Sequence, residues 1–287
     1  MADVPSCSSS KRGKAKAIRV SFEGNVGVGK SSLLHMLRSD PRLSSFTELL
    51  DEPVGGWQNV HGTGLNILQA FYENPHRYAY LFQSFVFITR FLQHNSASIS
   101  SGASLLLAER CVLTDRYVFV ETATEQGFFN NFEVAVYDSW YNAVVSALPN
   151  LIPDCFVYLR AQPEVCHDRL RKRARSEEIR VSIDYLKSLH EKHEKWFMKG
   201  EFDKEMGKPF DGAFKKGATY VGRLKISALN HIIQDRPVLV VDYDLNFGEG
   251  KPTFEQESMI EQIVTFLLGL LPPASERSTM DKCSEPL

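Results

Sequence analysis

Apolar runs and amphipathic stretches alternate along most of the chain, and this alternation predicts the fold. Three of the apolar runs have the continuous hydrophobic character of strands buried on both faces. The runs predicted to be strands are Ala17–Glu23, Phe46–Asp51, Ser104–Ala108, Cys155–Arg160 and Val238–Val241. The predicted helices are Ser31–Arg38, Leu65–Tyr72, Pro75–His94, Phe132–Leu148, Pro163–Arg173, Ser182–Phe197 and Phe254–Leu270. This order is typical of an α/β fold, a five-stranded parallel sheet flanked by helices on both faces, with ligands at the carboxyl ends of the strands.

Composition divides the chain into one domain and two tails. Residues 1–16 are mostly polar, and residues 272–287 are rich in serine, proline and charged residues, so both are expected to be disordered. Residues 17–271 form the predicted domain. Within it, residues 199–236 are rich in glycine and lysine and are interpreted as an insertion before the fifth strand.

Charge and cysteine content narrow the classes of partner. The formal net charge is −2, so no global field draws the protein to nucleic acid or to a membrane surface. The longest apolar run, around Ile263–Leu271, is far shorter than the roughly 20 residues that span a bilayer. The five cysteines form no C-x-x-C pair, which is typical of reduced intracellular thiols. We expect a cytoplasmic protein without nucleic-acid or membrane partners, and targeting to an organelle by the short N-terminal tail is less favoured.

The stretch SFEGNVGVGKSSL, from Ser21 to Leu33, contains the phosphate-binding pattern G-x-x-x-x-G-K-S. Glycines let the backbone curl around an anion so that successive N–H groups point at it, and the following helix adds its positive N-terminal dipole. Lys30 is placed to reach the β- and γ-phosphates, and the Ser31 hydroxyl can bind Mg²⁺. The residues predicted to form this nucleotide site are Gly24, Asn25, Val26, Gly27, Val28, Gly29, Lys30, Ser31 and Ser32.

A second strand ends in an acidic pair within LLDEPVGGWQNV, Leu49–Val60. Pro53 prevents the strand from continuing, which leaves Glu52 near the phosphate site. A carboxylate there can take a proton from an attacking hydroxyl as a general base, although an ordinary acid at a strand end fits the position equally well. The segment also resembles the D-x-x-G switch of a GTPase, but its glycine comes one residue late and no N-K-x-D motif is present.

Two further segments combine acidic and basic residues. In LLLAERCVLTDRYVF, Glu109 follows a strand and can help to hold Mg²⁺, while Arg110 can bind phosphate oxygens in bidentate fashion. In HDRLRKRARSEE, closely spaced arginines suit a mobile lid that closes over ATP phosphates. The alternatives are a surface ion-pair cluster for the first segment, and a solvated basic face or a nucleic-acid patch for the second.

The aromatic stretch AFYENPHRYAYLFQSFVFITRF carries Gln83 and Arg90, seven residues apart and so on one helix face. Aromatic rings can stack on a heterocyclic base, and an amide and a guanidinium can bind its edge. Plain core packing is the alternative for most of these rings. The sequence HEKHE at His190–Glu194 is not the H-E-x-x-H metal motif and is expected to be a solvated or capped helix face.

Together these segments resemble the deoxynucleoside kinase family, over roughly residues 17–197 and again over Pro237–Leu270. GNVGVGKS resembles the phosphate loop of the family, EPV its catalytic-base motif and FQ its base-binding pair. ERCVLTDRY resembles the E-R-S…D-R-Y segment, and RLRKRARSEE resembles the arginine lid. The resemblance implies a P-loop kinase fold, ATP as the phosphate donor, Mg²⁺ as the cofactor and a homodimer.

The resemblance also implies a role for each matching residue. Glu52 is the expected general base on the 5′-hydroxyl, and Arg110 is expected to steady both Glu52 and the transferring phosphoryl group, which Lys30 also contacts. Ser31 and Glu109 are expected to hold Mg²⁺, and Tyr72 and Glu178 to bind the sugar 3′-hydroxyl. The residues expected to contact the base are Phe82, Gln83, Arg90 and Asp115, with Trp57 and Phe119 packing around it. The donor phosphates are expected to bind Arg169, Arg173 and Arg175.

Two features depart from the usual family pattern, and one agreement with it bears on the substrate. Cys111 stands where the family has serine, while the 199–236 insertion and the segment SALPNLIPD resemble plant-like members. Arg90 and Asp115 resemble the pair of the deoxycytidine and deoxyguanosine kinases. An aspartate accepts a hydrogen bond from the amino group of cytosine or adenine, and Arg90 can donate to a purine N7 or O6. We expect deoxyadenosine, deoxyguanosine or deoxycytidine to be favoured over thymidine, in nucleotide salvage.

Two alternatives remain open from the sequence. A thymidylate-kinase-like nucleoside monophosphate kinase would share the loop, the D-R-Y segment and the lid. A non-catalytic P-loop nucleotide-binding switch would need neither Glu52 nor the arginine lid.

Overall fold

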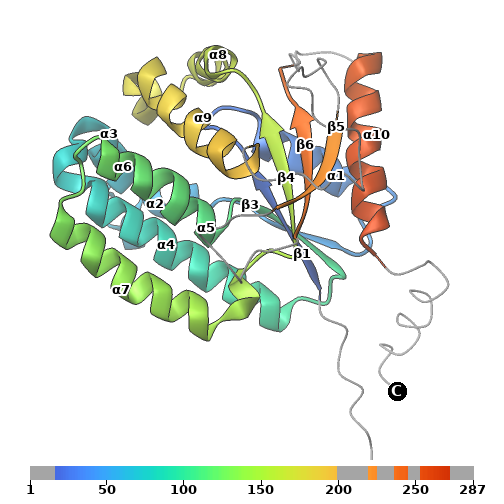
Figure 1. The fold of residues 1–287 in the computed structure, drawn as a ribbon, viewed down its shortest axis with the longest axis horizontal. Helices are drawn as coiled ribbons and strands as arrows, with labels where there is room; N and C mark the ends of the chain where they lie inside the picture. The colour runs from blue at the N-terminus through green and yellow to red at the C-terminus, as the bar shows by residue number, and fades with distance from the viewer. Residues whose placement is uncertain (1–16, 199–218, 225–235, 245–252, 272–287) are drawn as a thin grey trace, which may run out of the picture.

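The computed structural model describes residues 17–198, 219–224, 236–244 and 253–271 (Figure 1). The two tails expected at the ends of the chain lie outside these residues, as does most of the predicted insertion. None of the helices within the described residues is long and apolar enough to cross a membrane.

The elements follow the predicted alternation. The strands are β1 Ile18–Glu23, β2 Thr47–Leu50, β3 Leu105–Glu109, β4 Cys155–Arg160, β5 Thr219–Leu224 and β6 Arg236–Asp242. The long helices are α1 Lys30–Ser39, α3 Ile67–Glu73, α4 Pro75–Ser100, α7 Asn131–Ala147, α8 Pro163–Arg173, α9 Ile183–Phe197 and α10 Phe254–Gly269. The short helical turns are α2 Val54–Gln58, η1 Val60–Gly62, α5 Val112–Thr114, η2 Asp115–Val120, α6 Glu121–Glu125, η3 Pro149–Leu151 and η4 Ser176–Arg180.

The five predicted strands form a parallel sheet in the order β2-β3-β1-β4-β6, which confirms the predicted fold class. A sixth strand, β5, extends the edge of the sheet by pairing antiparallel with β6. It comes from the segment that the sequence pattern assigned only to an insertion. β1 is central, with β3 on one side and β4 on the other, so strand addition changes direction there. Ligands of open α/β sheets bind beyond the carboxyl ends of strands at such a point.

Side chains of the sheet alternate between two hydrophobic layers, as expected when both faces are covered. In β4, Phe156 and Tyr158 belong to a core shared with α4, α7 and α9. Val157 and Leu159 point the other way, into a core shared with α1 and α10. Figure 1 shows α7 and α4 stacked on one side of the sheet and α10 on the other. The predicted helix layers on both faces are thereby confirmed.

The helix α4 carries much of the site, and its start follows from its sequence. The Asn74 side chain caps it by accepting from the Arg77 N–H, and Pro75 occupies the first turn, where no N–H is needed. The helix runs to Ser100, beyond the predicted end at His94. Its last turns are rich in serine, which made the end of the helix hard to predict, but no glycine or proline interrupts it before residue 101.

A helical stretch from α5 through η2 to α6 follows β3, where the sequence pattern assigned no element. Valine, threonine and aromatic residues dominate it, and these favour strands when read by propensity alone. The η2 part is a π-helical turn, a form often found at functional sites. It brings Asp115 and Phe119 to the pocket wall.

Candidate active site

The phosphate-binding loop joins β1 to α1 and requires glycine at defined positions. Gly24, Gly27 and Gly29 have φ angles of 140°, 79° and 110°, which L residues rarely adopt. A Cβ on Gly24 would lie 2.5 Å from the Leu159 carbonyl oxygen, and one on Gly27 would lie 2.7 Å from that of Cys166. The loop therefore packs so closely on its neighbours that Gly24 and Gly27 cannot carry a side chain without moving the backbone.

Lys30 is buried at the start of α1 and bends back under the loop. Its Nζ donates to the carbonyl oxygens of Asn25 at 3.0 Å and Gly24 at 3.3 Å, and lies 3.8 Å from Glu109 Oε1. Burial lowers the pKa of Lys30 to about 8, with a further contribution from Arg110, while Glu109 and Glu52 oppose the shift. An anion in the loop would restore the ordinary affinity of this amine for its proton.

Two side chains with oxygen atoms, Ser31 and Glu109, lie side by side next to Lys30. The Ser31 hydroxyl donates to Glu109 Oε2 at 2.8 Å, joining the first turn of α1 to the end of β3. Mg²⁺ prefers hydroxyl, carboxylate and phosphate oxygens and usually binds through one or two protein ligands. The chemistry of this pair therefore fits a Mg²⁺ ion that also contacts donor phosphates.

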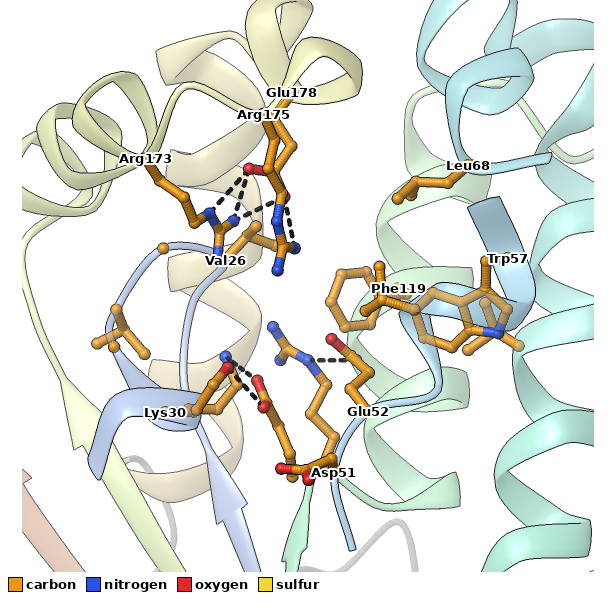
Figure 2. A pocket seen from close by; sticks show the side chains of 18 of the residues that line it. Val26, Lys30, Asp51, Glu52, Trp57, Leu68, Phe119, Arg173, Arg175 and Glu178 are labelled. Atoms are coloured by element: carbon orange, nitrogen blue, oxygen red, sulfur yellow. Dashed lines mark hydrogen bonds and ion pairs between the residues drawn. The ribbon is translucent and has the colours of Figure 1, made fainter. Parts of the chain in front are cut away.

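Glu52, just beyond β2, lies between two buried arginines. Its Oε1 is 3.0 Å from Arg90 Nη2 and 3.3 Å from Arg110 Nε. Burial pushes the pKa of Glu52 up, but the opposing effects of Arg110, Arg90 and Lys30 are larger in sum, so the pKa lies below its usual value. Figure 2 shows Glu52 between Lys30 on the loop side and Phe119 and Trp57 on the other. The carboxylate is thus ionised and faces the space between two halves of the pocket.

Arg110 connects Glu52 to the loop. Its Nη1 donates to the Gly24 carbonyl at 2.8 Å, and its guanidinium lies 4.8 Å from the centre of the Phe119 ring. The residue has a φ of 66°, a left-handed conformation that costs free energy in a non-glycine residue. Such strain is found mainly at functional sites, and here it turns the guanidinium back over the loop.

Arg90 and Asp115 form a fully buried ion pair at the back of the pocket. Arg90 Nε donates to Asp115 Oδ2 at 2.9 Å and Oδ1 at 3.1 Å, and its Nη1 donates to the Glu109 carbonyl at 2.7 Å. Burial raises the pKa of Asp115 to about 6 although Arg90 opposes the shift. Both groups are therefore charged at neutral pH, and one arginine holds both Asp115 and Glu52.

The outer part of the pocket has aromatic walls. Phe82 stacks on Phe71 with ring centres 4.9 Å apart and meets the edge of Trp57 at 5.7 Å. Gln83 is 2% exposed, and its Oε1 accepts no hydrogen bond from any described residue. A buried polar atom without a partner is uncommon in proteins and marks a place where a ligand can supply the missing donor.

The predicted arginine lid is divided. Arg173 and Arg175, near the end of α8, bind the Glu178 carboxylate at 2.6 Å and 3.5 Å, as Figure 2 shows above the pocket. Arg169 instead donates to the carbonyl oxygens of Val28 at 2.6 Å and Tyr243 at 2.9 Å. It braces the phosphate loop against the end of β6, which the charge pattern alone does not reveal.

Cys111, which replaces the serine of the family pattern, keeps a hydrogen bond. Its thiol donates to Glu23 Oε1 at 3.2 Å, and the Ser21 hydroxyl donates to the same oxygen at 2.6 Å. Burial raises the pKa of Cys111 well above its usual range, so the thiol remains protonated.

The predicted residues line one cavity of about 820 Å³. Among the predicted set, Gly24 and Asn25 do not line it. The Gly24 carbonyl binds Lys30 and Arg110, and the Asn25 amide donates to the Leu186 carbonyl at 2.8 Å. The lining residues that were not among the predicted site residues are His35, Asp51, Val54, Leu68, Phe71, Val86, Lys172, Tyr185 and Tyr243. Most of these residues lie in helices. The sequence pattern of a helix does not distinguish a residue that faces a ligand from one that packs in the core or faces solvent.

The site combines a phosphate-binding loop, an oxygen pair suited to Mg²⁺ and an ionised carboxylate, all facing one cavity of a parallel α/β sheet. This combination of fold and site is that of a P-loop kinase. A model of the deoxynucleoside kinase family matches residues 20–268. The chain belongs to this family and is therefore an enzyme, a phosphotransferase.

The curated relatives agree with the family model. Deoxycytidine kinase 2 of Gallus gallus is 31% identical over 87% of this chain and 90% of its own length. Deoxycytidine kinase of Rattus norvegicus is 30% identical with the same coverage of both chains. The mitochondrial deoxyguanosine kinase of Xenopus laevis is 35% identical over 63% of this chain and 73% of its own length.

Proposed function

We propose that this enzyme transfers the γ-phosphate of ATP to the 5′-hydroxyl of a deoxynucleoside. The observation that carries the proposal is the placement of Glu52. Its ionised carboxylate lies between Arg90 and Arg110, facing the cavity that the phosphate loop and the aromatic walls share. A general base must be ionised and must reach the proton of the acceptor hydroxyl. The lowered pKa of Glu52 and its place in the wall of the shared cavity support this role.

The donor is held by the loop. Its backbone N–H groups and the N-terminus of α1 bind the phosphates, and Lys30 contributes a full charge to the β- and γ-phosphates. Mg²⁺, bound by Ser31 with Glu109 beside it, supplies charge neutralisation when present. Arg173 and Arg175 complete the site from above. They keep Glu178 and offer the donor oxygens the guanidinium N–H groups that do not bind it.

Transfer of the phosphoryl group depends on how the two substrates are positioned and on how the charge that develops is stabilised. Glu52 accepts the proton of the 5′-hydroxyl as the oxygen bonds to phosphorus, and the bond from phosphorus to the leaving oxygen of ADP breaks. Arg110 keeps Glu52 oriented through its Nε and is close enough to the loop to follow the charge on the moving group. Orientation and electrostatic stabilisation supply most of the acceleration in such reactions.

The acceptor occupies the aromatic half of the pocket. Burial, together with the neighbouring Tyr185 and Glu178, raises the pKa of Tyr72, so its hydroxyl stays protonated and can donate to the sugar 3′-hydroxyl. Glu178 accepts from the same hydroxyl. The partnerless Oε1 of Gln83 and the ionised Asp115 are both acceptors, which suits a base with an exocyclic amino group. We therefore propose that deoxyadenosine, deoxyguanosine and deoxycytidine are preferred to thymidine.

A homodimer is proposed from an apolar stripe on α4. Leu81, Ile88, Leu92 and Ile99 are 49%, 47%, 57% and 76% exposed, and their spacing of seven, four and seven residues puts them on one face. Phe132 and Val136 on the adjacent α7 are also exposed. Exposed apolar residues in such a contiguous pattern mark an interaction surface.

The cellular role follows from the chemistry. Phosphorylation of a preformed deoxynucleoside is a step of nucleotide salvage. A cytoplasmic location is proposed from the cysteines, because Cys111, Cys155 and Cys166 are buried and unpaired among the described residues, as is usual in a reducing compartment.

The direct test is product analysis with Mg²⁺-ATP, four deoxynucleosides and their four 5′-monophosphates. The proposal predicts 5′-monophosphates from deoxyadenosine, deoxyguanosine or deoxycytidine, with kcat/KM for thymidine at least about tenfold lower, since a mismatched buried polar group costs about 1–3 kcal/mol. Formation of diphosphates from monophosphates would instead identify a monophosphate kinase.

The proposed base preference is tested by comparing the wild type with a double variant of the Arg90–Asp115 pair. Arg90→Met with Asp115→Ala removes the ion pair without leaving an unpaired charge between them, and should raise the thymidine-to-deoxycytidine ratio of kcat/KM. If the wild type already prefers thymidine, the pair is not the base filter.

A further inference from the structure

Two adjacent carboxylates on η4, in the lid, contact opposite sides of the pocket. Glu178 binds Arg173 and Arg175, which belong to the donor side. Glu177 is 9% exposed and binds instead to residues at the edge of the nucleoside pocket. Glu177 lies within the RLRKRARSEE segment that resembles the arginine lid, but the proposed mechanism gives it no role.

Glu177 accepts several hydrogen bonds at once. Its Oε1 accepts from Gln58 Nε2 at 2.9 Å and from Asn66 Nδ2 at 2.9 Å, and its Oε2 accepts from the Ser176 hydroxyl at 3.1 Å. Hydrogen bonds lower the pKa of this carboxyl to about 2. They come from the backbone N–H of Glu177 and from the side chains of Asn66, Gln58 and Ser176. The carboxylate therefore stays charged and fully bonded at any physiological pH.

The two amides belong to the segments that carry the nucleoside wall. Gln58 ends α2 directly after Trp57, which lines the pocket. Asn66 caps α3, accepting from the Gln69 N–H at 2.9 Å through Oδ1 while its Nδ2 donates to Glu177. One carboxylate thus fixes the lid to both α2 and α3, and α3 carries Tyr72.

We propose that Glu177 is a positioning residue that couples donor binding to deoxynucleoside binding. η4 is too short for its two carboxylates to move independently. When Arg173 and Arg175 are ordered by donor phosphates, η4 is held as well, and Glu177 then holds α2 and α3 around the nucleoside. This inference rests on the proposed function.

The coupling is thermodynamic, so each ligand must raise the affinity for the other by the same factor. The observable is a coupling factor: the Kd of the deoxynucleoside alone divided by its Kd with a non-hydrolysable ATP analogue and Mg²⁺. Coupled sites show factors of about 5 to 150. Calorimetry with deoxycytidine, deoxyguanosine and deoxyadenosine measures it for the wild type.

Asn66→Asp is the sharpest variant. Aspartate caps a helix as well as asparagine does, so α3 keeps its cap, but the new carboxylate faces Glu177 without a donor. The coupling factor should fall to within about twofold of one. Adding Glu177→Gln to this variant reverses the polarity of the contact, because the amide at position 177 can then donate to the carboxylate at position 66. The double variant should therefore recover most of the coupling.

Two controls separate coupling from general damage. Glu164→Ala removes an exposed carboxylate of α8 that lies outside the pocket, and should leave the coupling factor unchanged. Thermal unfolding checks that each variant is folded, and Glu177→Ala provides a second way to remove the contact should Asn66→Asp unfold.

The outcomes distinguish the two proposals. If the wild type transfers no phosphate to any deoxynucleoside, the proposed function is wrong. If it transfers phosphate but its coupling factor is one, or if Asn66→Asp and Glu177→Ala keep the wild-type factor, the role of Glu177 is wrong and the proposed function stands. Loss in the single variants with restoration in the double variant supports the inference.

Discussion

At the scale of single residues, the site depends on one buried arginine that serves two carboxylates. Arg90 is 1% exposed and holds Asp115 through Nε and Glu52 through Nη2. Removing it alone would leave two carboxylates short of a counter-charge, which is among the costliest changes in a protein interior. A substitution at the base-binding pair therefore also disturbs the general base, so base preference has to be judged from ratios of kcat/KM between nucleosides.

Lys30 gives a prediction for pH dependence. Because burial lowers the pKa of Lys30 to about 8, the free enzyme loses this proton as pH rises through that value, and the neutral amine cannot pair with phosphate. The charged form is needed for donor binding, so affinity is complete below pH 8 and falls above it, by up to about tenfold per pH unit. Calorimetry in two buffers of different ionisation enthalpy should show proton uptake on ATP binding near pH 8.

The control for this prediction is Lys30→Met, which should bind ATP weakly and without proton uptake. Wild-type binding that takes up no proton between pH 8 and 9 would show that Lys30 is already fully charged in the free enzyme.

At the scale of elements, the phosphate loop is fixed by close backbone contacts. Gly27→Ala would place a Cβ 2.7 Å from both the Cys166 carbonyl oxygen and Leu170 Cγ at a φ of 79°. We predict a loss of about 1–3 kcal/mol in unfolding free energy, together with weakened ATP binding, because the loop must move. Chemical denaturation and calorimetry measure the two effects.

Gly55→Ala is the matched control. Gly55 lies within α2, and a Cβ there would meet no described atom within 4 Å. Alanine in a helix should stabilise the protein by about 0.5–1 kcal/mol relative to glycine. Equal effects of the two substitutions would contradict the packing of the loop.

The elements also show how far the sequence determines the fold. The parallel strands and the seven longer helices were predictable, because apolar runs and helical periodicity mark most of each element, although the end of α4 was not. β5 was not, since its six residues include a glycine and lie in a lysine-rich context. The turn η2 was not either, because its β-branched and aromatic residues favour a strand by propensity, and packing against α4 and α9 determines its shape instead.

The candidate site also divides into residues that the sequence could predict and contacts that it could not. Motifs predicted most of the residues that line the cavity. The phosphate loop, Glu52 and the Glu109-Arg110 pair follow strands, while the base-binding residues of α4 and the arginine lid were found from their residue types. The bracing of the loop by Arg169 and the contacts of Glu177 with Gln58 and Asn66 were not predictable, since they join segments far apart in the sequence. Such contacts depend on how helices pack, and local patterns carry no information about that.

At the scale of the whole molecule, the apolar stripe on α4 predicts self-association. Leu92→Glu would put a charge in the middle of the stripe and should convert a dimer into a monomer. Sedimentation measures the mass directly. Phe254→Glu, at a still more exposed site on α10, should leave the dimer intact. A wild-type monomer at micromolar concentration would contradict the assignment of this surface.

The two halves of the pocket meet at Glu52, so the most direct test of the account is Glu52→Gln. The amide keeps the shape of the side chain but cannot accept the 5′-hydroxyl proton. Single-turnover phosphoryl transfer from ATP should slow by about 10²–10⁴-fold, the usual contribution of a positioned base, while the Kd of the deoxynucleoside changes by less than about fivefold. A transfer rate within about fivefold of the wild type would contradict the account, because Glu52 would then not be the base.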